Sequence, residues 1–252
     1  HGRTITTLAA SGQDALHKDF GPFTEGFVYV TAGDLAELEA AMSRKDVCAI
    51  MLELIQGEGG LNVLDEAYVK AAVRLAKERD ILVLIDEVQT GNGRTGKLYC
   101  YMNYGIKPDI ISTAKGIAGG LPMGATMFAE KTAGVLTGGS HGSTFGGNPV
   151  CAAGALSIMR RIDDALMEEI TKKGEYVKYA LSVQKGVKSV CGLGLMIGVE
   201  TEKDAKEVAK ACLEKGLIVL TAKTKIRLLP ALNIPMEQLK KAIELFKEVL
   251  VS

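Results

Sequence analysis

The sequence predicts an α/β fold built on a mainly parallel β-sheet, because short apolar runs alternate with helical periods in its N-terminal part. The run ILVLI at 81–85 is uniformly apolar, as expected for a strand that is covered on both faces. A helix is expected at about 65–79, between this run and the strand CAIMLELI at 48–55. Such sheets carry helices on both faces and bind ligands beyond the carboxyl ends of their strands.

Further elements are predicted on both sides of this unit. FVYV at 27–30 is expected to form a strand, and Asp34 is expected to cap the following helix, with Glu37 in the capping-box position. Two more strands are predicted at 109–113 and 124–129.

The C-terminal part has a different pattern of expected helices and strands, which predicts a second, smaller domain. A long helix is expected from about 148 to 173. After it come a glycine-rich strand (191–200), a helix (204–216), two short strands (217–222 and 225–230) and a closing amphipathic helix (236–250). We therefore predict a partial large domain over residues 1–155 and a small C-terminal α+β domain over residues 156–252.

Composition indicates a cytoplasmic globular protein that acts on small molecules. The 252 residues include thirty basic and thirty acidic side chains, so net charge gives no case for binding nucleic acid or an anionic membrane. The five cysteines lie far apart without a C-x-x-C pair, and the three histidines show no metal-ligand spacing. No apolar run approaches the ~20 residues of a membrane helix. We expect reduced thiols and no metal site.

The stretch ILVLIDEVQTGNGRTGK at 81–97 offers a different interpretation, a nucleoside triphosphatase. Its strand ends in Asp86, and two glycines and Lys97 have the spacing of a phosphate loop. However, Leu98 follows Lys97 and cannot ligate magnesium, and this segment follows the acidic strand instead of preceding it. A P-loop-like nucleoside triphosphatase is therefore the remote alternative.

Part of this stretch and four other motifs have to be explained together. They are HGRT (1–4), IDEVQTGNGRTG (85–96), ISTAKGIAGGLPMG (111–124), GSHGSTFGGNP (139–149) and KIRLLPALN (225–233). In this order they resemble the class III aminotransferases, pyridoxal-phosphate enzymes that include ornithine, 4-aminobutyrate and acetylornithine aminotransferases. LELIQGEGG (52–60) fits too, although the family usually has proline where Leu54 stands. The resemblance implies fold type I of the pyridoxal-phosphate-dependent transferases, with a truncated large domain that binds the cofactor.

The resemblance assigns four residues to pyridoxal 5'-phosphate. Asp86 is the carboxylate that keeps the ring nitrogen protonated, which a buried acid beside it favours. Lys115 is the catalytic lysine that holds the cofactor covalently and shuttles a proton. Gln89 reaches the phenolic oxygen, and Val88 packs on the ring face. Taken alone, an aspartate after a strand is more often a cap or turn residue, and a lysine in a glycine-rich loop is usually solvated.

The resemblance also implies a homodimer with shared active sites. In the family, the residues matching Ser143 and Thr144 reach the cofactor phosphate of the neighbouring subunit, and hydroxyl groups are suitable phosphate donors. Without the resemblance, these two residues are equally consistent with a glycine-rich turn.

Three residues match substrate-binding positions of the family. Arg227 matches the arginine for the α-carboxylate of glutamate and 2-oxoglutarate, and Arg3 matches a second arginine for the other carboxylate. Glu53 matches the acid that pairs with the first arginine when the substrate offers it no carboxylate. Without the motifs, each arginine would be read as part of a surface ion pair.

The expected function is transfer of the ω-amino group of N-acetylornithine to 2-oxoglutarate in a ping-pong cycle, a step of arginine biosynthesis. A related acylated diamino acid or ornithine is an open alternative as donor. The family has a further segment before HGRT, with a phosphate-binding helix N-terminus and an aromatic residue that stacks on the ring. We expect that segment to be missing, so that this chain binds cofactor weakly. A non-catalytic fragment without cofactor is the second hypothesis.

Overall fold

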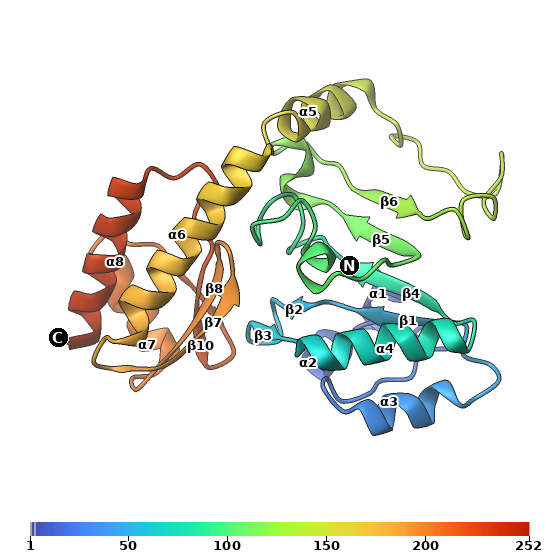
Figure 1. Cartoon of the computed structure of the whole chain (residues 1–252), viewed down its shortest axis with the longest axis horizontal. Helices are drawn as coiled ribbons and strands as arrows, with labels where there is room; N and C mark the ends of the chain where they lie inside the picture. The colour runs from blue at the N-terminus through green and yellow to red at the C-terminus, as the bar shows by residue number, and fades with distance from the viewer. Residues whose placement is uncertain (1, 3, 252) are drawn as a thin grey trace.

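The computed structural model describes residue 2 and residues 4–251, which form two lobes around separate β-sheets (Figure 1). The first sheet has the order β1-β4-β5-β6. Its strands are β1 (Ala49–Leu52), β4 (Leu82–Asp86), β5 (Ile110–Thr113) and β6 (Ala125–Phe128). β1, β4 and β5 run parallel, and β6 pairs antiparallel with β5. The predicted α/β class with a mainly parallel sheet is therefore confirmed.

Helix α4 (Glu66–Glu78) covers one face of this sheet, and α3 (Leu35–Met42) packs against α4. Val83 and Ile85 are buried on this face of β4, in the same core as the apolar side of α4. On the other face Leu84 is half-buried and Met51 is 44% exposed. Among the described residues, then, only one face is fully covered. Asp86 alternates with Ile85 along β4 and therefore lies on the less covered face.

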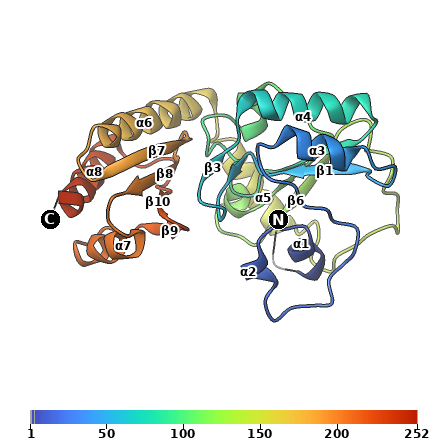
Figure 2. The same ribbon diagram turned by 90° about the horizontal axis from the view of Figure 1, so that it is seen from below.

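Shorter elements complete the N-terminal lobe. They are α1 (Ile5–Ala9), α2 (Asp14–His17), β2 (Ile55–Gln56), β3 (Asn62–Val63), η1 (Cys100–Tyr104), η2 (Lys115–Ala118) and α5 (Pro149–Met159). Figure 2 places α1 and α2 beneath the first sheet, on the side away from α4. β2 and β3 form a two-stranded hairpin, and α5 packs against η2 through Ala155 and Ile117.

The C-terminal lobe is an antiparallel sheet of order β7-β8-β10-β9 with helices on one face (Figure 1). Its strands are β7 (Val187–Leu193), β8 (Met196–Thr201), β9 (Leu220–Ala222) and β10 (Lys225–Leu228). The helices α6 (Asp164–Ser182), α7 (Ala205–Glu214) and α8 (Met236–Val251) share one core with Ile197, Val199 and Ile226. Residues that alternate with these on the strands face the N-terminal lobe. None of the described helices combines the length and apolar character needed to cross a membrane.

Some sequence expectations on secondary structure were wrong. Residues 27–30 form no strand; they run along the surface, where the Tyr29 hydroxyl donates to Ala9 O at 2.6 Å. The expected long helix is broken after Met159, because Asp163 caps a new helix by accepting from Leu166 N at 2.8 Å. The expected single strand at 191–200 is formed by parts of two strands, because β7 ends at Leu193 and β8 begins at Met196, with Gly194 at φ +53° in the turn between them.

Helix α3 begins as predicted at Asp34, whose side chain accepts from Glu37 N at 2.9 Å. The Glu37 carboxylate binds Thr31 N at 2.7 Å, so the capping box is only half formed. Residues 155 and 156, where we predict the division between domains, both lie within α5. The division at this point stays a prediction.

The lobes meet at loop 91–97, which follows β4. Arg94 donates from one guanidinium nitrogen to Leu195 O at 3.1 Å and to Pro230 O at 2.6 Å. Leu195 N returns a bond to Arg94 O at 3.0 Å. A side chain at Gly194 would lie 2.7 Å from Arg94 O, so glycine is required for this close approach. Loop 91–97 therefore fixes the C-terminal sheet against the end of β4.

Candidate active site

The candidate site starts at the carboxyl ends of β4 and β5, as expected for a parallel sheet. β4 ends at Asp86, which pairs in register with Ser112 of β5, and Lys115 follows three residues later. Asp86 is 7% exposed, and its Oδ1 accepts from Val88 N at 2.9 Å and from Ser112 Oγ at 3.5 Å. The fold thus brings a buried carboxylate and a lysine to the same edge of the sheet.

Lys115 has an unusual backbone conformation, and the pKa of its amine is lowered. Its φ of +49° lies in the left-handed region, which costs a residue other than glycine about 1 kcal/mol. Lys115 as a whole is exposed. Its amine is nevertheless partly desolvated by the surrounding protein, and this desolvation lowers the pKa of the amine. The charges of Glu53, Asp86 and Glu58 act in the opposite direction. A larger neutral fraction makes this amine a better nucleophile.

Asn92 holds the backbone directly before Lys115. Its Nδ2 donates to Thr113 Oγ1 at 3.0 Å and to Ala114 O at 3.1 Å. Asn92 itself is 5% exposed and adopts φ +56°, so loop 91–97 and the lysine segment fix each other. The sequence analysis missed Asn92, because only the fold brings residues 92 and 113 together.

Gln89 presents a donor that no described residue accepts. Its Oε1 accepts from Arg227 Nη1 at 3.2 Å, while its Nε2 is buried without a hydrogen-bond partner. Gly57 leaves space for this amide, since a side chain there would collide with it. A buried unpaired donor costs about 1–3 kcal/mol, so its presence indicates an acceptor supplied by a ligand.

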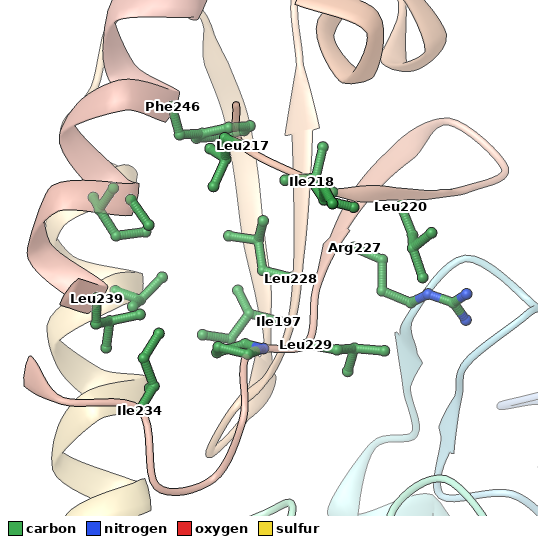
Figure 3. A pocket seen from close by; sticks show the side chains of 15 residues that line it. Ile197, Leu217, Ile218, Leu220, Arg227, Leu228, Leu229, Ile234, Leu239 and Phe246 are labelled. Carbon is green, nitrogen blue, oxygen red and sulfur yellow. The ribbon is translucent and has the colours of Figure 1, made fainter. Parts of the chain in front are cut away.

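Arg227 reaches the site from the other lobe. It is 8% exposed and lies on β10, and its Nη1 forms an ion pair with Glu58 Oε1 at 2.7 Å. Its Nε is buried without a partner. Figure 3 shows the guanidinium pointing from β10 toward the pale-blue hairpin that carries Glu58. Arg227 is therefore held by a carboxylate whose side chain is itself 44% exposed.

The carboxylate that pairs with Arg227 belongs to Glu58, whereas the sequence led us to expect Glu53. Glu53 was expected to pair with Arg227, but its Oε1 accepts from Gly57 N at 3.2 Å and Glu58 takes the arginine. Glu53 precedes the hairpin, whereas Glu58 lies in its turn, which points at β10. Burial raises the pKa of Glu53 to about 7, against the bond from Gly57 and with help from the charge of Asp86.

Glu87 is a buried acid with a structural role. It is fully buried, and its carboxylate accepts from Thr90 Oγ1 at 2.6 Å, Cys100 N at 2.9 Å and Tyr101 N at 2.8 Å. Burial raises its pKa, although these bonds oppose the change. Glu87 thus anchors the segment after β4 to the backbone at residues 100 and 101.

The glycine-rich loop that imitates a phosphate loop has no room for phosphate. Gly91 is buried, and a side chain there would lie 2.7 Å from Glu87 O. Gly96 packs against Thr171 of α6, and Lys97 is exposed. Loop 91–97 is occupied by contacts between the lobes, which counts against the nucleotide interpretation.

The remaining predicted residues lie at different distances from this cluster. Val88 is 8% exposed at the end of β4, beside Asp86. Ser143 and Thr144 are exposed in the long connection between β6 and α5, which extends away from the first sheet in Figure 1. Arg3 lies outside the described residues. Within the described part of the chain no group of three His, Cys, Asp or Glu side chains could hold a metal ion.

A separate apolar cavity of about 410 Å³ lies in the C-terminal lobe (Figure 3). It is lined by side chains such as Ile197, Leu228, Leu239 and Phe246. Of the candidate site residues that the structure describes, Arg227 alone touches it. Its lining offers no carboxylate or amine beside this guanidinium, so it is not the place of the chemistry.

Two curated proteins similar to this chain are acetylornithine aminotransferases. An acetylornithine aminotransferase of Haemophilus ducreyi is 48% identical over 252 residues, covering 99% of this chain and 64% of that protein. An acetylornithine aminotransferase of Aquifex aeolicus is 40% identical, with 99% and 66% covered. The chain thus spans about two thirds of the length of these curated relatives.

Two solved aminotransferase structures share the fold of this chain. An ornithine aminotransferase from Toxoplasma gondii superposes with a TM-score of 0.93 at 32% identity, over 99% of this chain and 62% of that one. An acetylornithine aminotransferase from Elizabethkingia anophelis gives a TM-score of 0.83 at 31% identity, over 90% and 63%. The sequence profile of the family Aminotransferase class-III matches residues 1–250. The chain therefore belongs to the class-III aminotransferase family.

Proposed function

We propose that this chain serves a pyridoxal-phosphate-dependent aminotransferase that moves the ω-amino group of N-acetylornithine, or of a related diamino acid, to 2-oxoglutarate. The observation that carries this proposal is the convergence of Asp86, Gln89 and Lys115 from one lobe with Arg227 from the other. The curated relatives named above are acetylornithine aminotransferases, which supports the acylated donor.

The donors and acceptors at the site fit pyridoxal phosphate. Asp86 offers a buried carboxylate for a protonated ring nitrogen, and Lys115 offers a primary amine for an aldehyde. The free Nε2 of Gln89 would donate to the phenolic oxygen. A related ornithine aminotransferase structure of Toxoplasma gondii has pyridoxal phosphate in partial occupancy at its active site. When bound, this cofactor supplies an electron-withdrawing ring that stabilises negative charge on the substrate carbon.

Lys115 then serves as acid and base for the reaction. Its lowered pKa brings the amine closer to neutral pH, where it can accept a proton from the substrate carbon and later return it. Asn92 fixes the preceding backbone, so the amine stays at the edge of the sheet between the two half-reactions.

The Arg227 ion pair explains how one pocket accepts two kinds of substrate. A dicarboxylic acid such as 2-oxoglutarate can replace Glu58 on the guanidinium and also use the free Nε for a bidentate contact. A donor without a carboxylate at this position leaves Glu58 on Arg227, so the buried charge is never unpaired. This switch assigns to Glu58 the role that the sequence analysis expects of Glu53.

We also propose that two copies form a homodimer with shared active sites. α5 is built almost entirely of apolar residues, yet Val150 is 65% and Leu156 is 57% exposed. A helix that is apolar on all sides requires cover, and α5 directly follows the exposed segment with Ser143 and Thr144. A partner seated on α5 would bring that segment to a second active site, where the hydroxyls can bind phosphate.

A cytoplasmic location suits this proposal. All five cysteines are free thiols, as expected in a reducing compartment. Three of them, Cys48, Cys151 and Cys191, are partly or fully exposed.

Trapping the cofactor tests the proposed function. The chain is incubated with pyridoxal phosphate, reduced with borohydride and digested for peptide mass spectrometry. We expect a pyridoxyl group on the peptide with Lys115 and none in Lys115→Ala, while the control Lys97→Ala is labelled like the wild type. Label spread over exposed lysines, or none at residue 115, would instead support a non-catalytic fragment.

Activity is tested separately. Formation of glutamate from N-acetylornithine and 2-oxoglutarate, compared with ornithine as donor, decides the substrate. Label at Lys115 without glutamate formation would keep the cofactor site and reject the transfer activity of this chain.

A further inference from the structure

Cys191 and Lys225 lie side by side on the face of the C-terminal sheet that looks toward the N-terminal lobe. In the strand register Cys191 of β7 is opposite Gly198 of β8, and Gly198 is opposite Arg227 of β10. Lys225 is two residues before Arg227 and thus on the same face. Because Gly198 has no side chain, Cys191 Sγ and the Leu61 side chain can pack over β8; a side chain at this position would lie 3.0 Å from Cys191 Sγ and 2.9 Å from Leu61 Cβ.

The lysine amine contacts the thiol directly. Lys225 Nζ is 3.6 Å from Cys191 Sγ, and no carboxylate of the described residues forms an ion pair with this amine. Oxidants react with the sulfur of a cysteine in its thiolate form, and an amine at this distance can reach an oxidised sulfur. Both side chains are partly exposed, so a small oxidant can enter.

The same thiol also joins the two lobes. Cys191 Sγ donates to Leu61 O at 3.2 Å, and Leu61 directly precedes β3 in the hairpin that carries Glu58. The other cysteines lack this combination. Cys100 and Cys212 are fully buried, and neither the exposed Cys48 nor the partly exposed Cys151 has a lysine partner among the described residues.

We propose that Cys191 and Lys225 are an oxidisable pair that hydrogen peroxide converts into a covalent cross-link between β7 and β10. The Cys191 thiolate attacks one peroxide oxygen, the O–O bond breaks, and a sulfenic acid and hydroxide result, so sulfur is oxidised and peroxide reduced. The neutral Lys225 amine then attacks the sulfur, the S–O bond breaks, and water leaves with a proton from nitrogen. The sum is one thiol, one amine and one peroxide giving an S–N bond and two waters.

The cross-link changes the contact between the lobes. Sulfur loses its hydrogen, so its bond to Leu61 O is lost and the hairpin with Glu58 is held less firmly. At the same time β10 becomes tied to β7 two residues before Arg227. On the proposed function, a less firmly held Glu58 would compete less for Arg227, so oxidation would strengthen the binding of dicarboxylates. The chemistry at residues 191 and 225 is independent of that function.

Peptide mapping after treatment with hydrogen peroxide tests the pair. In the folded wild-type chain we expect one joined peptide containing residues 191 and 225, lighter than its two parts by two hydrogen atoms and separated again by a thiol reductant. Cys191→Ser should give no joined peptide. Lys225→Arg should instead accumulate a sulfenic acid at Cys191 that dimedone labels.

Two controls keep the test specific. Lys223→Arg, near Lys225 but outside the contact, and Cys48→Ser should cross-link like the wild type. Circular dichroism confirms that each variant is folded. The proposal is overturned if the joined peptide forms equally in urea, or if dimedone labels Cys191 as fully in the wild type as in Lys225→Arg.

Discussion

Two arginines at the seam between the lobes, Arg94 and Arg227, occupy similar surroundings and are satisfied in opposite ways. Arg94 donates only to backbone carbonyls, those of Leu195 and Pro230, and burial lowers its pKa to about 10. Arg227 is held by two side chains, Glu58 and Gln89, and keeps Nε unpaired. Backbone carbonyls cannot move away, but an exposed carboxylate can.

On the proposed function, this difference separates a structural arginine, Arg94, from a substrate-binding one, Arg227. The acceptors of Arg94 are fixed by two strands or loops of the C-terminal lobe, so a ligand cannot replace them. The acceptor of Arg227 is 44% exposed and can return to water when another carboxylate arrives. A substrate-binding arginine is thus recognised by a carboxylate partner that can move into water and by a guanidinium N–H that has no acceptor.

The largest expected effect is on stability, at Arg94. Arg94→Met leaves two inter-lobe carbonyls without donors, so we expect the free energy of unfolding to fall by about 2–4 kcal/mol. Urea unfolding followed by circular dichroism measures this. Arg74→Met, which breaks only an exposed pair with Glu78, is the control and should cost less than about 1 kcal/mol. An equal loss of stability in the two variants would contradict the structural role of Arg94.

The next effect depends on pH and concerns Glu53. Its pKa rises on folding from 4.5 to about 7, so the folded state binds the proton more tightly between these values. Stability is therefore lost as pH rises through this window, because the carboxyl of the unfolded chain ionises while the buried carboxyl still holds its proton. The amide of Glu53→Gln does not titrate. Above this window, the free energy of unfolding of the variant should therefore exceed that of the wild type by about 2–3 kcal/mol.

Urea unfolding at roughly pH 5 and pH 8 measures the Glu53 effect. Glu25→Gln, on an exposed segment, is the control and should keep the profile of the wild type. An advantage of Glu53→Gln that is the same at both pH values would contradict the raised pKa.

The smallest effect is expected at Glu58. Glu58→Gln removes the carboxylate that competes for Arg227, so 2-oxoglutarate should bind up to about tenfold more tightly, a gain of about 1.4 kcal/mol. Calorimetry of the chain loaded with pyridoxal phosphate measures this. Glu53→Gln is the matched acid, and equal tightening in both variants would mean that a general loss of negative charge is responsible.

Sequence reasoning reached the elements with local signals and missed those set by distant contacts. The strand at 82–86 and helix α4 carry an apolar pattern and a cap, and both form close to the predicted places. Asp163 carried a capping signal that was overlooked inside a continuous helical period. The residues at 27–30 have strand composition, but no described strand pairs with them.

The same division applies to the site. The position of Lys115 after a strand could be predicted, whereas the choice between Glu53 and Glu58 depends on which way a two-stranded hairpin turns. The role of Arg94 depends on partners 101 and 136 residues away in the chain. No local pattern carries that information.

Calorimetric titration of 2-oxoglutarate into Arg227→Met tests most directly whether this arginine binds the carboxylate. The chain is loaded with pyridoxal phosphate, and Lys225→Met, a neighbouring cation on the same face of β10, is titrated beside it. We expect Arg227→Met to weaken binding at least about 30-fold, a loss of about 2 kcal/mol, and Lys225→Met to change it less than about threefold. Equal weakening in the two variants, or none at Arg227, would contradict the assignment.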